Sequence, residues 1–102
     1  MKGSTGHVRA PAAPTLPVLV FDHDEASMTW SPTPPQDCFV AELYHVTTGL
    51  VEVRGQAGDQ SGVDFLTPTT PGQWYYARVR AFLEGEFSTW AASIAVESPS
   101  GP

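Results

Sequence analysis

Residues 71–81 read PGQWYYARVRA, and this stretch decides the fold. After a Pro-Gly turn signal, small or apolar residues alternate with larger polar or aromatic ones: Tyr75, Ala77, Val79 and Ala81 against Tyr76, Arg78 and Arg80. A period of two is that of a β-strand with one face in a core and the other in solvent. We therefore expect a strand over 75–81 that belongs to a half-buried sheet.

The same period recurs on both sides of this stretch. Turn-forming segments rich in Gly, Pro, Asp and Thr separate the alternating runs, and no window shows a sustained helical period. The expected strands cover residues 15–21, 26–30, 39–44, 50–53, 63–65, 75–81 and 90–96. Seven short strands with this spacing predict an all-β protein, a seven-stranded antiparallel β-sandwich.

Length and composition indicate one small domain with short tails. The chain has 102 residues, 10 Pro and 9 Gly, and only 16% of its residues are charged, which disfavours a helical bundle. We expect a flexible N-terminal arm over 1–10, the folded domain over 11–97, and a C-terminal tail over 98–102.

The charge balance excludes several classes of partner. Eleven acidic residues face five basic ones, for a net charge of −6. Such a surface repels nucleic acid and anionic membranes. The single cysteine, Cys38, cannot form an internal disulfide. The sequence has neither an apolar run long enough for a membrane helix nor a secretory leader, so we expect no nucleic acid and no membrane insertion.

Over residues 11–97 the sequence resembles a fibronectin type III domain. Pro11 and Pro14 open it, Met28-Thr29-Trp30 resembles its strand B, and 39–43 its strand C. The stretch 71–81 resembles the turn and strand that carry its conserved tyrosine, and 88–90 the start of its last strand. The resemblance and the alternation together imply a core. Its expected members are Met28, Trp30, Phe39, Leu43, Phe65, Tyr75, Val79 and Ile94.

The resemblance also implies a tyrosine corner. Tyr75 follows a Pro-Gly turn, where its hydroxyl can bond a backbone group upstream. The family has a leucine six residues before that tyrosine, whereas this chain has Thr69. We expect Leu66 to take over the packing. The Arg-Gly-Asp tripeptide of integrin-binding members is absent, and Arg54-Gly55-Gln56 is the nearest string.

Two surfaces are candidates for interaction. The first is one outer sheet face, with a strip of small residues (Ala91, Ser93 and Ala95) beside it. Its expected members are Val40, Glu42, Tyr44, Trp74, Tyr76, Arg78 and Arg80. These types are enriched in interface hot spots, but a plain cross-strand ladder that pairs Glu42 with Arg78 would also use them. The second is the loop of Phe82, Leu83, Glu84, Glu86 and Phe87. It is either an apolar anchor in an acidic rim or a loop with two apolar residues packed beneath it.

The residues offer no convincing catalytic or metal site. Cys38 and His45 would lie about 23 Å apart on one extended strand, too far for a nucleophile and its base. The Asp22–Glu25 cluster has ligand types suited to a cation, but it lacks a calcium-loop spacing and fits a solvated turn. We expect no enzyme activity and no cofactor.

The expected function is therefore structural. A chain that begins with Met, holds one domain, has one lysine and is rich in Ala, Pro and Gly fits a bacteriophage virion component. Fibronectin type III-like domains occur in phage tails and on capsid surfaces, as tail or decoration proteins. The expected partner is protein, in a virion or cell-surface assembly, with surface glycan as a further candidate. The expected location is the virion, made in the host cytoplasm. The alternative is a spacer or binding module of a longer bacterial cell-surface or carbohydrate-processing protein.

Overall fold

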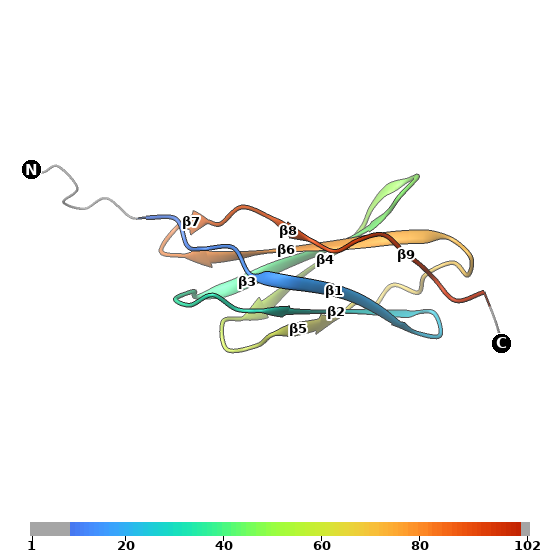
Figure 1. Ribbon diagram of the computed structural model, residues 1–102, viewed down its shortest axis with the longest axis horizontal. Coiled ribbons are helices and arrows are strands. Elements are labelled where there is room, and N and C mark those ends of the chain that lie inside the picture. Colours follow the sequence, from blue (N-terminus) through green and yellow to red (C-terminus); the bar gives the residue numbers. More distant parts are fainter. Residues whose placement is uncertain (1–8, 101–102) are drawn as a thin grey trace, which may run out of the picture.

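The computed structural model describes residues 9–100 and shows a two-layered β-sandwich. Two antiparallel sheets lie face to face (Figure 1). Within residues 9–100 no helix forms, and so none is present that could cross a membrane. The predicted all-β class and sandwich are confirmed. Residues 1–8 of the expected arm, and residues 101–102 of the expected tail, lie outside the described residues.

The smaller sheet has three strands in the order β1-β2-β5. Its members are β1 (Thr15–Asp22), β2 (Glu25–Ser31) and β5 (Gly62–Asp64). The β1–β2 hairpin closes through His23, which takes a left-handed backbone with φ of 58°. Three of the expected strands therefore form this sheet, each within a few residues of its predicted bounds.

The larger sheet has six strands, and its central strand is the one that carries residues 74–83. The path β4-β3-β6-β7 contains β4 (Gly49–Ala57), β3 (Cys38–His45), β6 (Trp74–Leu83) and β7 (Glu86–Phe87). Two further strands, β8 (Ala91–Ala92) and β9 (Val96–Glu97), also pair with β6. The last strand expected from the sequence is thus divided into short pieces along one edge.

Two serines explain these interruptions. Ser88 and Ser93 each donate a backbone N–H to β6 and use the side-chain oxygen to accept an N–H from it. The acceptor distances are 2.9 Å from Ala81 N and 3.0 Å from Ala77 N. A hydroxyl that replaces a backbone carbonyl in the ladder forces a local bulge, and a bulge shifts which side chains face the core.

The core lies between the two sheets, and seven of the eight expected core residues are buried in it. Ile94 is the exception, because it is 81% exposed. The prediction for Ile94 was wrong because the bulge at Ser93 breaks the alternation that was carried through residues 90–96. Ala91 and Val96 pack against the core from this edge instead. The buried members are Met28, Trp30, Phe39, Leu43, Phe65, Tyr75 and Val79.

The tyrosine corner is formed. The buried Tyr75 hydroxyl accepts a hydrogen bond from the Thr70 backbone N–H at 2.9 Å. Thr69 is buried, and its hydroxyl donates to the Asp24 carbonyl at 2.9 Å and lies 2.8 Å from Ser98 Oγ. Leu66 is 70% exposed, so the expectation that it fills the missing leucine position was wrong. A buried polar cluster holds this corner, and it includes Ser98, which we had expected at the start of the tail.

A carboxylate ties the edge strand β4 to the segment that follows β5. Glu52 accepts hydrogen bonds from the backbone N–H groups of Leu66 and Thr67, at 2.9 Å and 2.7 Å. Partial burial alone would raise the pKa of Glu52, but these donors outweigh it and hold the pKa below its ordinary value. Arg54 Nε, 3.8 Å away, adds a weaker attraction. Glu52 therefore stabilises the fold in its charged form.

Candidate interaction face

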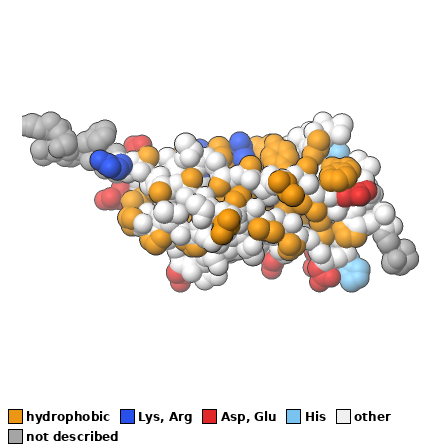
Figure 2. Space-filling view, viewed as in Figure 1, with side chains coloured by type: hydrophobic (Ala, Val, Ile, Leu, Met, Phe, Trp, Pro, Cys, Tyr) orange, Lys and Arg blue, Asp and Glu red, His pale blue; other side chains and the backbone are white. Residues whose placement is uncertain are grey.

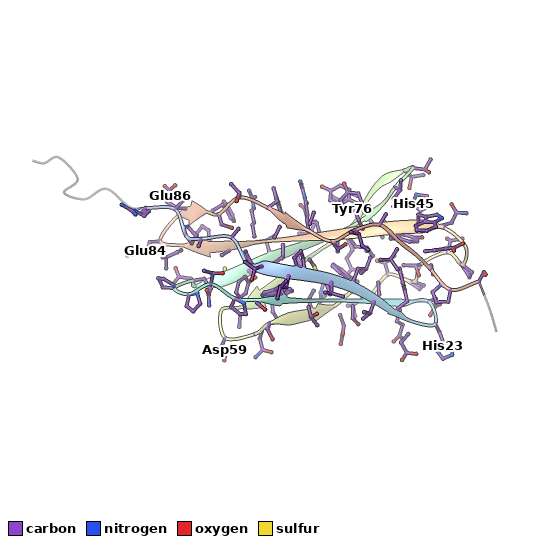
Figure 3. The ribbon with its side chains drawn as sticks, viewed as in Figure 1. His23, His45, Asp59, Tyr76, Glu84 and Glu86 are labelled. Atoms are coloured by element: carbon purple, nitrogen blue, oxygen red, sulfur yellow. The ribbon has the colours of Figure 1, made fainter. Side chains whose placement is uncertain are left out.

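The seven residues of the candidate face lie together on the outer side of the larger sheet. The pairing of β3 with β6 sets three of them directly opposite three others: Val40 opposite Arg80, Glu42 opposite Arg78, and Tyr44 opposite Tyr76. Trp74 continues the row at the start of β6. The outward orientation predicted from the alternation is therefore confirmed for these strands. We call this surface the outer face; in Figure 3, Tyr76 lies toward one end of the molecule and Glu84 and Glu86 mark the other.

Three polar side chains near the centre of the outer face form a closed set. Arg78 Nε donates to Glu42 at 2.7 Å, and Arg78 Nη2 donates to the Tyr44 hydroxyl at 2.9 Å. The Tyr44 hydroxyl donates to Glu42 at 2.9 Å. The predicted Glu42–Arg78 pair is therefore present. Each of the three side chains is hydrogen-bonded to the other two.

Contacts within this set raise the pKa values of Tyr44 and Arg78. The hydrogen bond to Glu42 is the main cause that raises the pKa of Tyr44, and burial adds to it. Burial alone would lower the pKa of Arg78, but its bond to Glu42 and that carboxylate's charge raise it. Both residues therefore keep their protons through neutral pH.

Aromatic rings hold the two arginines of β6. The guanidinium carbon of Arg78 lies 3.9 Å from the centre of the Trp90 ring. That of Arg80 lies 4.4 Å from Trp90 and 3.7 Å from Phe87. Tyr44 and Tyr76 stack with centroids 5.0 Å apart and planes 4° from parallel. Aromatic rings thus cover the guanidinium groups of both arginines, and such stacking fixes the side chains in place.

Trp90 was missed as a member of the outer face. Unbroken alternation through 90–96 would turn Trp90 inward and leave the small-residue strip outside. In the structure Ala91 turns toward the core, Ala92 lies opposite Arg78, and Trp90 covers the arginines. The expected strip is therefore wrong at Ala91, for the same reason as at Ile94. The two outward-facing arginines of β6 could have predicted the position of Trp90, because an aromatic ring can stack on a guanidinium group.

The strand β4 adds apolar side chains that the sequence reasoning also missed. Val53 lies opposite Glu42, and Leu50 lies opposite Tyr44, because β4 pairs with β3. Leu50 and Val53 are 54% and 51% exposed. A register shift next to Tyr44 places residues three apart on one face, so a period of two does not reveal them. The outer face is thus wider and more apolar than expected.

The candidate loop is a tight hairpin between β6 and β7. Glu84 and Gly85 both have left-handed backbones, with φ of 49° and 87°, as a two-residue type I′ turn requires. Phe82 and Phe87 pair across the hairpin with ring centroids 4.9 Å apart. Phe82 and Leu83 are half-buried while Phe87 is exposed, which agrees with two apolar residues packed beneath the loop.

At the opposite end of the outer face, His45 organises the β3–β4 turn. Its Nδ1 accepts the backbone N–H groups of Thr47 and Thr48, at 3.0 Å and 3.2 Å. Nε2 lies 3.2 Å from Gln73 Oε1, so it carries the ring proton and donates it there. The histidine has a structural role, and Cys38 lies at the far end of the same strand. The two are not brought together as a catalytic pair.

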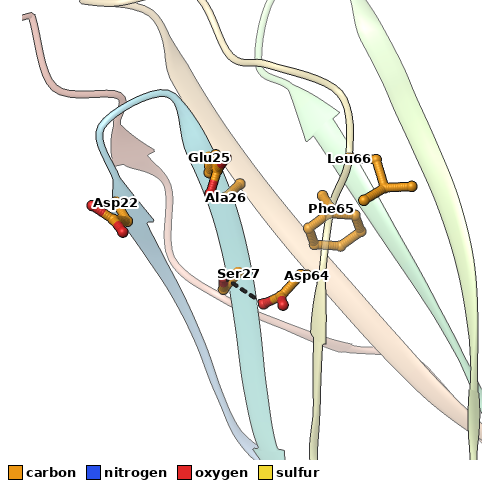
Figure 4. A pocket seen from close by; sticks show the side chains of 7 residues that line it. All are labelled: Asp22, Glu25, Ala26, Ser27, Asp64, Phe65 and Leu66. Carbon is orange, nitrogen blue, oxygen red and sulfur yellow. Dashed lines mark hydrogen bonds between the residues drawn. The ribbon is translucent and has the colours of Figure 1, made fainter.

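The Asp22–Glu25 turn forms no metal site in the described residues. His23 and Asp22 contact each other at 3.0 Å, and both side chains are more than four-fifths exposed. No group of three or more His, Cys, Asp or Glu side chains within residues 9–100 is placed to hold a metal ion. Asp22 and Glu25 line a shallow pocket of about 370 Å³ with Asp64, which accepts a hydrogen bond from Ser27 at 2.9 Å (Figure 4).

Comparisons with known proteins place the fold but not the function. No model of a known protein family matches the sequence, and no curated protein matches it. The structure is similar to the fn3 domain of human collagen α-1(XX) chain, with a TM-score of 0.76, 18% identity and 93% of each chain covered. It is also similar to the FN5 domain of Drosophila Lar, with a TM-score of 0.67, 19% identity, and 90% and 100% covered.

A third similar structure is a two-domain fibronectin type III segment of chicken tenascin. The TM-score is 0.75 at 17% identity, and 86% of this chain matches half of that one. The resemblance seen in the sequence is thus confirmed at the level of structure. The chain has a fibronectin type III-like fold, in which its larger sheet carries the outer face.

Proposed function

We propose that this domain is a non-enzymatic protein-interaction module that docks on an assembly through the outer face. The observation that carries the proposal is the composition of that face. Apolar side chains that are about half exposed, such as Trp74, Leu50 and Val53, surround a centre whose polar groups are already paired. Exposed apolar area around a fixed polar centre is the arrangement of an interface core.

The rigidity of the outer face supports docking over a purely structural role. Arg78 is fixed by hydrogen bonds and rings, so little side-chain entropy is lost when a partner covers it. Arg80 is held between Phe87 and Trp90, and no carboxylate within residues 9–100 pairs with it. Arg80 Nε is buried without a hydrogen-bond partner among residues 9–100, so an acceptor on the partner would have to meet the terminal nitrogens of the guanidinium. The residues that form the cross-strand ladder are therefore also the residues of the proposed docking site.

The assembly we propose is a bacteriophage virion, with the domain as a tail or capsid-surface component that aids adhesion to the host. The support is compositional: an acidic domain with a single lysine can cover an assembly without binding its nucleic acid. Neighbouring reading frames test this directly. Capsid, portal or tail genes beside the coding sequence support the virion, whereas a longer open frame of a surface or carbohydrate-processing protein contradicts it.

The docking itself is tested with matched lysine variants. Val53→Lys places a charge on the outer face, and Thr29→Lys places the same charge on an exposed site of the smaller sheet. Both sites are solvent-accessible, so both variants should keep the wild-type melting temperature within a few degrees. We expect Val53→Lys to abolish incorporation into particles and Thr29→Lys to leave it intact. Normal incorporation of Val53→Lys contradicts the proposal.

A spacer role in a longer bacterial surface protein is the second candidate, and one observation favours it. The described chain begins at one end of the long axis of the sandwich and finishes at the other (Figure 1). Domains joined end to end in a row need this arrangement. In a spacer the outer face has no partner, so Val53→Lys would leave every binding property of the parent protein unchanged.

A further inference from the structure

The edge of β1 that faces away from β2 carries few of the features that protect edge strands. Among the described strands β1 pairs only with β2, so its other edge presents backbone N–H and C=O groups to no strand. Natural edge strands are guarded by charges, prolines or bulges. In β1 the guards are Pro17 and a bulge between Thr15 and Val18, both in the first half of the strand. Residues 18–21 have none of these guards, and they carry no charge.

Apolar side chains line this edge in solvent. Leu16, Val18 and Val20 are 73%, 48% and 50% exposed, and Ile94 reaches the same side from the larger sheet. Leu16 has a left-handed backbone with φ of 53°, which a leucine adopts only under strain. Figure 2 shows apolar side chains in a band over β1 and the β8–β9 segment, while the acidic side chains visible there lie toward its rim.

A groove runs beside the free edge. It measures about 320 Å³ and lies between β1 and the broken last strand of the larger sheet. Because Ser93 interrupts that strand, Ile94 turns outward and forms one wall. Most of the lining is apolar: Pro17, Val18 and Leu19 from β1, and Ala92, Ile94 and Val96 from the opposite wall.

We propose that this edge binds a second copy of the chain, by antiparallel pairing of β1 with β1 across a twofold axis. An antiparallel strand edge is its own complement under that symmetry. Pairing over residues 18–21 joins the two three-stranded sheets into one, satisfies the free backbone groups, and shields the groove and Ile94 from water.

Charge permits a second copy to approach at this edge. Each chain carries a net charge of −6, so two copies repel over most of their surfaces. The segment from Thr15 to Phe21 has no charged residue, and antiparallel pairing keeps the two Asp22 side chains at opposite ends of the contact. The contact therefore sets no like charges directly opposite each other. It also leaves the outer face of each copy free, so it does not depend on the function proposed above.

Sedimentation equilibrium of the full chain tests the proposal, from about 10 μM to about 1 mM. We expect a reversible monomer–dimer equilibrium within this range. It should tighten as salt rises from about 0.01 M to about 1 M, because the Debye length then falls from about 30 Å to about 3 Å. The substitution Val18→Lys should weaken dimerisation about tenfold or more, because it adds a charge to each edge.

A matched control separates edge pairing from other contacts. Thr29 is exposed, and it lies directly beside Val18 on the same sheet face but one strand away from the edge. Thr29→Lys should leave the dimer unchanged, and in the wild type the β1 amides should exchange more slowly at high concentration. A chain that stays monomeric at about 1 mM overturns the proposal. So does a dimer that Val18→Lys and Val20→Lys leave intact, or one that Thr29→Lys breaks equally. The proposal is also contradicted if the chain stays monomeric and its β1 edge binds an apolar segment of another protein instead.

Discussion

Trp30 offers the sharpest test of the packing, because its ring is buried while its N–H has no partner within residues 9–100. Its side chain is 4% exposed, and it packs against Phe39 with ring centroids 5.1 Å apart. Burial of an aromatic side chain of this size removes about 150–250 Å² from water. At about 25 cal/mol per Å² this is worth about 4–6 kcal/mol. Alanine keeps a small part of the burial, so Trp30→Ala should lower the free energy of unfolding by about 3–5 kcal/mol.

Trp30→Phe should behave very differently. The Nε1 atom of Trp30 is buried with no hydrogen-bond partner among the described residues, and an unpaired buried donor costs about 1–3 kcal/mol. Phenylalanine removes that donor and loses about 1–2 kcal/mol of burial. The two effects oppose each other, so the net change should stay within about 1 kcal/mol.

Urea denaturation of the wild type and both variants measures these differences. A chain of this size should unfold in a single cooperative transition. The free energy of unfolding is obtained from the midpoint and slope of that transition. A loss below about 1 kcal/mol for Trp30→Ala would refute the core assignment of this residue. A loss above about 2 kcal/mol for Trp30→Phe would show that the indole N–H is paired.

Three further predictions concern polar contacts. Glu52→Gln should lower the free energy of unfolding by about 1–2 kcal/mol. Because the pKa of Glu52 is lowered in the folded state, its contribution to stability should be present above the ordinary pKa of about 4.3 and lost as the pH falls through the lowered pKa. Urea melts of the wild type from pH 7 to pH 2 should therefore show an acid-dependent loss of stability that the variant lacks. Tyr75→Phe should lower the free energy of unfolding by about 1–2 kcal/mol in a thermal or urea melt, because the Thr70 N–H loses its acceptor. An unchanged melt would show that this hydrogen bond does not stabilise the fold. Glu42→Gln should lower the pKa of Tyr44 toward its ordinary value, measured by NMR titration of the ring, and an unchanged titration contradicts the hydrogen bond described here.

The strands with strict alternation were predictable from the sequence. Every second residue is buried over 39–43 in β3 and over 75–81 in β6, so both the core and the outward-facing residues there follow from a period of two. The sandwich class followed from the number and spacing of such runs. The position of Tyr75 after a Pro-Gly turn was enough to predict its hydrogen bond to an upstream backbone group.

The positions of the other side chains depended on bulges, which a period of two in the sequence does not reveal. The hydroxyls of Ser88 and Ser93 replace backbone acceptors along β6, and each replacement shifts the phase of the last strand. Ile94 is exposed and Trp90 lies on the outer face for this reason. The register shift near Tyr44 hid Leu50 in the same way. A serine in a strand gives no sign in the sequence of whether its side chain will join the ladder.

Oxidative footprinting of the domain, free and within the particle that incorporates it, tests docking through the outer face most directly. Trp74 and Leu66 are 50% and 70% exposed in the free chain and lie at different parts of the sandwich, Trp74 on the outer face and Leu66 in the segment that follows β5. Docking through the outer face predicts that Trp74 loses most of its reactivity in the particle while Leu66 keeps its own. Unchanged oxidation of Trp74 in the particle would contradict docking through the outer face.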